Sequence, residues 1–167
     1  VAPMIQAAAQ GDPDQVLCAR ILEVLRWFGP LAIEPALRAY AEAERDEVRW
    51  GFAGLLSECG VRDERIFQVL IEEVRRDALS AGQLARYGDH RAVDHLRREI
   101  DRYEVEAGGD PQANWELMEI LQAIEDLGGA LTAEQAERLR SLLQRRRERS
   151  PVAAALDSFF APFERLA

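Results

Sequence analysis

The sequence is poor in several residue types on which common protein functions depend. All 21 basic residues are arginine, and the chain contains no lysine. A Schiff-base lysine or a phosphate-loop lysine of its own is therefore excluded. Only two histidines and two cysteines are present. Two cysteines are too few for a disulfide framework. Both Cys18 and Cys59 lie in apolar helical stretches, so we expect them to be buried thiols.

The charge balance and the lack of long apolar runs exclude further classes of protein. Thirty acidic residues against 21 basic ones give a net charge of −9, whereas a general nucleic-acid binder normally has a basic footprint. No segment is apolar enough to span a membrane. The first residues lack the basic and apolar regions of a signal peptide. We therefore expect a cytoplasmic protein with neither a membrane nor a nucleic acid as its partner.

What the sequence does contain is a series of apolar segments with helical period, and no segment alternates like a strand. Glycines close four of these segments, as expected of left-handed helix ends. Acidic or hydroxyl residues begin several helices, with Asp63 and Asp89 as N-caps and a capping box between Thr132 and Gln135. The glycines are Gly29, Gly60, Gly88 and Gly128. The predicted helices span 14–28, 31–43, 46–59, 64–75, 78–87, 90–105, 111–127, 132–148 and 151–166.

Helix-closing glycines about 30 to 40 residues apart suit repeated helix pairs, which bury their apolar faces only by stacking. The predicted fold is all-α, a right-handed α-solenoid of about four antiparallel helix pairs plus a C-terminal helix in one domain. Three phenylalanines give the last helix a large apolar load. It either closes the core or offers a docking patch to a partner. The repeats span about 14–43, 46–75, 77–105 and 110–148, and the terminal helix spans 151–166.

Four segments carry a resemblance to a known family. The run DEVRWGFAGLLSECG at 46–60 resembles the first helix of a HEAT-like repeat of the phycobilisome-lyase type, which opens with an acidic residue, x, Val-Arg and ends in glycine. The run GDHRAVDHLRREI at 88–100 resembles the turn and second helix of that repeat, and AIEPALRAY at 32–40 is a weaker copy. The run LSAGQLARYGD at 79–89 fits the first helix again. The resemblance covers about residues 16–105.

This resemblance implies an architecture more than an activity, because such repeats serve scaffolds, adaptors and a few enzymes. We expect a non-catalytic scaffold or adaptor that binds another protein on its concave face. One alternative is a HEAT-like lyase or chromophore-handling factor, as the family resemblance would imply. A nucleic-acid-binding HEAT protein is the other alternative, which the charge of −9 disfavours.

Searching the chain for chemistry gives few candidates. His95 and Glu99 are spaced i, i+4 on a predicted helix, where they could bind a metal, but no third ligand has a suitable spacing. No nucleophile elbow, phosphate loop or dinucleotide fingerprint occurs. The arginines at 145–147 and 149 close a helix, where cations are favoured, and could also meet an acidic partner. We therefore expect no enzyme activity, no metal and no cofactor.

The candidate partner-binding residues are polar positions of the second helix in each predicted pair, which we expect to line the concave face. Their mixed charges suit protein recognition through steering and register. Trp50 lies beside the apolar stripe of a first helix, where a partly exposed indole could anchor a partner or pack between repeats. The charged candidates are Glu72, Glu73, Arg76, His95, Arg98, Glu99 and Arg102.

Overall fold

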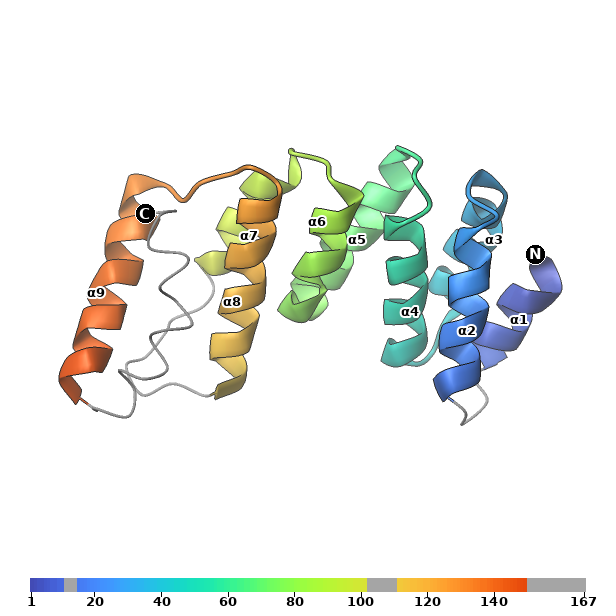
Figure 1. Ribbon diagram of the computed structural model, residues 1–167, viewed down its shortest axis with the longest axis horizontal. Helices are drawn as coiled ribbons and strands as arrows, with labels where there is room; N and C mark the ends of the chain where they lie inside the picture. The colour runs from blue at the N-terminus through green and yellow to red at the C-terminus, as the bar shows by residue number, and fades with distance from the viewer. Residues whose placement is uncertain (11–14, 102–110, 150–167) are drawn as a thin grey trace. The chain divides into compact units, whose positions relative to one another are not determined.

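The computed structural model describes residues 1–10, 15–101 and 111–149, and these are helical without any strand (Figure 1). The chain divides into two compact units, Val1–Glu73 and Val74–Ala167. The α-helices are α1 Ala2–Gln10, α2 Gln15–Arg26, α3 Pro30–Glu42, α4 Asp46–Ser57, α5 Glu64–Arg76, α6 Ala81–Tyr87, α7 Ala92–Ile100, α8 Pro111–Asp126 and α9 Ala133–Arg149, and the 3-10 turn η1 spans Ala78–Ser80.

These bounds confirm the predicted helices between residues 15 and 149, with two differences. The helix expected over 78–87 begins as the 3-10 turn η1, in which Asp77 accepts a hydrogen bond from the backbone of Leu79. Helix α1 was not predicted at all. The expected helix over 151–166, and the part of 90–105 beyond residue 101, lie outside the described residues.

The predicted helix ends are confirmed in their backbone geometry. The glycines at 29, 60, 88 and 128 all have positive φ, between 48° and 72°, the left-handed conformation that a side chain would oppose. Asp63 and Asp89 each accept a hydrogen bond from the backbone N–H two residues later. Thr132 and Gln135 exchange the two hydrogen bonds of a capping box. Local sequence therefore sets where these helices begin and end.

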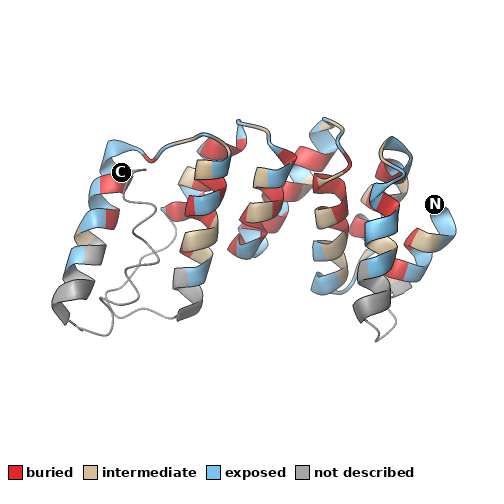
Figure 2. Cartoon of the chain, viewed as in Figure 1, coloured by how far each residue is buried: buried red, intermediate tan, exposed pale blue. Residues whose placement is uncertain are grey.

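In the first unit, helices contact both the next helix in the chain and the next helix but one. Helix α2 packs beside α4, and α1 packs beside α3, while α1 also contacts α2 and α3 contacts α4. The buried residues lie on the sides of the helices that face these neighbours (Figure 2). The largest fully buried side chains of this unit are Leu25, Phe52, Leu55, Leu56, Ile66 and Leu70. Burial of apolar area on this scale is the main source of its stability.

The second unit repeats the arrangement. Helix α6 packs beside α8, and α8 also contacts η1 and α7. Its largest fully buried apolar side chains are Leu84, Leu96, Ile120, Leu121 and Ile124. Among the described residues, none of the helices has the length and apolar character needed to cross a bilayer.

Candidate functional site

Helices α3, α5 and α7 share one pattern of burial, which leaves corresponding positions exposed on each of them. We aligned residues 31–40, 65–74 and 91–100. At nine of the ten positions, the three residues are buried, half-buried or exposed alike. The pattern buries Ala36, Leu70 and Leu96 at one position, and it exposes Arg38, Glu72 and Arg98 two residues later. Within the helices, two exposed positions four residues apart recur in all three. We call these six residues the second-helix face: Glu34, Arg38, Gln68, Glu72, Asp94 and Arg98.

An aspartate–arginine pair recurs at the start of this face. The guanidinium of Arg65 lies 2.7 Å from the carboxylate of Asp63, and that of Arg91 lies 2.8 Å from Asp89. Hydrogen bonding from Arg65 lowers the pKa of Asp63 below its ordinary value. Arg65 also reaches Glu34 on the neighbouring α3, at 2.6 Å. The pair therefore caps its helix, and in the first unit it also links two successive second helices.

In the first unit the structure separates the predicted partner-binding residues. Glu72 is exposed, and Trp50 is 48% exposed, in line with an indole that is partly accessible. Glu73 is only 5% exposed, and its carboxylate accepts a 2.7 Å hydrogen bond from the hydroxyl of Tyr40 on α3. Placing Glu73 on an accessible face was therefore wrong, because it joins α3 to α5 inside the unit.

In the second unit the same distinction holds. Arg76 and Arg98 are exposed and His95 is half-buried, whereas Glu99 is 8% exposed. Glu99 occupies the register position of Glu73, and because it is buried as well, placing it on the accessible face was wrong. Arg102 lies outside the described residues.

The surroundings of His95 are basic. Burial lowers the pKa of its imidazole below 6.5, and the positive charges of Arg98, Arg75 and Arg91 lower it further, against the opposing effect of Asp94. Protonation of His95 is therefore less favourable in the folded chain than in the unfolded chain. The exposed arginines around it favour an acidic group on a partner at this part of the second-helix face.

This environment predicts a pH dependence of stability. Because the folded pKa of His95 lies below the unfolded value of 6.5, the unfolded chain binds more protons, and folding loses stability as the pH falls through about 6.5. The variant His95→Gln should lose less stability than wild type between about pH 7.5 and 5.5. Urea titrations at each pH would measure this, and equal losses in the two proteins would contradict it. The lowered pKa values of Asp63 and Asp101 affect stability only at more acidic pH.

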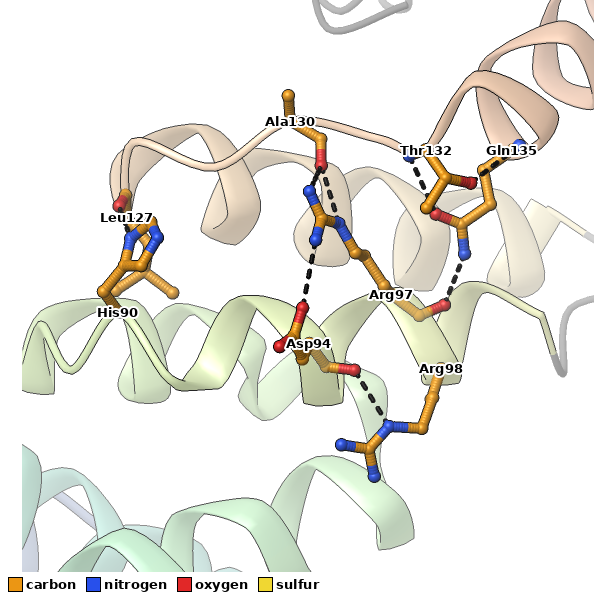
Figure 3. Close-up of polar contacts among 8 residues, drawn as sticks. All are labelled: His90, Asp94, Arg97, Arg98, Leu127, Ala130, Thr132 and Gln135. Carbon is orange, nitrogen blue, oxygen red and sulfur yellow. Dashed lines mark hydrogen bonds and ion pairs between the residues drawn. The ribbon is translucent and has the colours of Figure 1, made fainter.

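A set of polar contacts attaches the turn between α8 and α9 to helix α7 (Figure 3). The His90 ring lies 2.9 Å from the carbonyl of Leu127 through Nδ1, and Arg97 donates to the carbonyl of Ala130 at 2.5 and 2.8 Å. Gln135 donates from its side chain to the carbonyl of Arg97. Sequence reasoning missed these contacts because their acceptors are backbone carbonyls, which carry no residue signature.

A cavity of about 590 Å³ lies in the first unit between α1, α3 and the start of α4. Ile5 and Gln6 of α1 line it together with Arg38 and Glu42 of α3 and Arg45 of the following turn. Arg38 therefore lines the cavity and also belongs to the second-helix face. This cavity was not predicted, because α1 itself was not predicted.

The structure also places the residues considered for metal binding and for thiol chemistry. The described residues contain no group of three or more His, Cys, Asp or Glu arranged to hold a metal ion, and His95 with Glu99 gains no third ligand there. Cys59 is buried, as predicted, and burial raises the pKa of its thiol, which disfavours the reactive thiolate. The side chains of Cys18 and of the arginines at 145–149 lie outside the described residues.

Comparison of the chain with protein-family models, with curated proteins and with solved structures gives no match.

Proposed function

We propose that this chain is a HEAT-like, right-handed α-solenoid that acts as a non-catalytic adaptor and binds another protein on its second-helix face. The observation that carries the proposal is the shared burial pattern of α3, α5 and α7. A pattern that recurs in register leaves the same positions exposed on successive helices. Stacked repeats use such surfaces to bind extended partners. We propose the cytoplasm as the compartment, as expected from the sequence.

Equivalent packing within the two units supports the repeat. A Cβ atom on Gly51 of α4 would lie 2.9 Å from Leu22 of α2, and one on Gly82 of α6 would lie 3.5 Å from Glu119 of α8. Aligned on the glycines that close α4 and α8, Gly51 and Glu119 occupy the same register position. Helix α4 therefore contacts α2 with the same part of its surface that α8 uses to contact α6.

The charges of the face favour a protein partner over a polyanion. In the first unit the exposed Arg38 stands with Glu34 and Glu72, whereas in the second unit the exposed Asp94 and Arg98 stand with the exposed Arg75 and Arg91. Mixed signs of this kind fix the register of a polypeptide with complementary side chains. A nucleic acid would require a continuous basic surface instead.

Site-specific photo-crosslinking tests the proposal. A benzophenone amino acid would replace Glu72 or Arg98 on the face, or the exposed Gln122 on α8 as a matched control on a first helix. In lysate of the source cell, positions 72 and 98 are expected to capture the same protein, and position 122 is not. Reversing the charge in Arg98→Glu should weaken capture from position 72. Equal capture from position 122, or no protein captured from 72 and 98, would contradict the proposed function.

A further inference from the structure

The end of α2, the turn after it and the start of α3 expose a group of large apolar side chains. Trp27 is 84% exposed, Leu31 is 72%, Val24 is 46% and Phe28 is 37%. Side chains of this size rarely stand together in water unless they serve an interaction. Trp27 and Phe28 directly precede Gly29, the residue that ends the helical segment with a positive φ.

At the corresponding positions of α4, the side chains are buried against a neighbouring helix. Aligned on the closing glycines Gly29 and Gly60, Val24 corresponds to Leu55, and Phe28 corresponds to Cys59. Leu55 is 1% exposed and Cys59 is 6% exposed. Helix α2 is the neighbour that packs on this side of α4, where the position of a Cβ on Gly51 lies 2.9 Å from Leu22.

Helix α8 confirms that this register position receives a helix. Glu119 of α8, which corresponds to Gly51, lies against Gly82 of α6. Ala123, which corresponds to Leu55 and Val24, is 1% exposed. The same face is thus covered by a first helix on α4 and on α8, and among the described residues it stays exposed on α2.

We propose that this face of α2, formed by Arg20, Val24 and Trp27, is a binding site for an amphipathic helix of a partner protein. The helix would pack beside α2 in the way that α2 packs beside α4. This inference concerns the first helices and does not depend on a partner at the second-helix face.

The differences between α2 and α4 define the chemistry of the partner helix. On α4, Glu58 forms a 2.9 Å ion pair with Arg26 of α2. Trp27 occupies the position of Glu58, so the partner helix should present an apolar side chain where α2 presents Arg26. Arg20 occupies the position of Gly51, and its 74% exposed side chain forms a 3.0 Å ion pair with Glu23, which is exposed as well and leaves the other nitrogens of the guanidinium to a second carboxylate. The partner helix should therefore present a carboxylate where α2 presents Leu22.

A designed peptide tests this site. The probe is a fluorescein-labelled, helix-stapled peptide of residues 15–28 of this chain carrying Cys18→Ser, Leu22→Glu and Arg26→Leu. Anisotropy should show saturable binding to the full chain with a Kd on the order of 10 µM. Trp27→Glu in the protein should weaken binding at least about tenfold. Trp115→Glu, which changes an indole that is 57% exposed on α8, should leave binding unchanged, and circular dichroism would confirm that both variants fold.

Several results would overturn the inference. They include no saturable binding to the wild type, or equal binding to Trp27→Glu. A Trp27-dependent dimer in light scattering would show that a second copy is the occupant, and Trp27-dependent sedimentation with phosphatidylcholine vesicles would show that a lipid surface is. Either result would show that the occupant of this face is not a helix of a partner protein. Capture at positions 72 and 98 reports on the other face, so the two proposals fail separately.

Discussion

Replacing Leu96 by alanine is expected to lower the free energy of unfolding by about 2–5 kcal/mol. Leu96 of α7 has no exposed surface, so the substitution removes buried apolar atoms and leaves a cavity. Urea unfolding followed by the helical circular dichroism signal would measure the loss. Arg98→Ala is the control, because it shortens an exposed side chain two positions away and should change stability by no more than about 0.5 kcal/mol.

The burial pattern that α3 shares with α7 allows a second test at the same position, in which a buried side chain is enlarged instead of shortened. Ala36 of α3 corresponds to Leu96 and is also fully buried, but its neighbours are fitted to a methyl group. Ala36→Leu should therefore destabilise the chain by about 1–3 kcal/mol through overpacking.

For the first variant, Leu96→Ala, a loss of stability below about 1 kcal/mol would show that this position is not part of a packed core.

Gly129→Ala is expected to cost about 1–3 kcal/mol. A Cβ atom at this position would lie 2.8 Å from both methyl groups of Val93 and 3.2 Å from Ile124, well inside van der Waals contact. The clash arises where the turn after α8 meets α7, beside the polar contacts of Figure 3. Thermal or urea unfolding of the single variant would measure its cost.

A double-mutant cycle identifies the cause of that cost. Val93→Ala removes the two methyl groups that meet the new Cβ, so the double variant should be more stable than the sum of the single changes predicts, by at least about 0.5 kcal/mol. Additive losses would contradict the steric account. Gly128→Ala is a useful comparison, since its Cβ would meet nothing within 4 Å and only its φ of +68° opposes the substitution.

Local sequence signals predicted most of the helix boundaries. A glycine with positive φ and an aspartate or threonine cap act through neighbouring backbone groups, so a reader of the sequence can place them without knowing the fold. Helix α1, in contrast, is a short run rich in alanine and glutamine, and its contacts with α2 and α3 are tertiary. Propensity alone does not establish a helix of that length.

The candidate site was only partly predictable for a related reason. Helical period placed Glu72 and Arg98 on an exposed face correctly, but it assigned Glu73 and Glu99 to that face as well. The burial of Glu73 depends on a hydrogen bond to Tyr40, which lies 33 residues away in the chain. A long-range partner of this kind leaves no mark in the local pattern of charges. The exposed end of α2 likewise becomes visible only when its neighbours are known.

Pulsed electron spin resonance distances test the central claim, an open row of repeats, most directly. Leu31, Arg62 and Ala130 are exposed at corresponding turn positions after Gly29, Gly60 and Gly128, and spin labels would replace them in pairs. With helices packed about 10 Å apart, an open row predicts distances that increase from 31–62 through 62–130 to 31–130. A distance for 31–130 no longer than that for 62–130 would indicate a closed bundle and contradict the account.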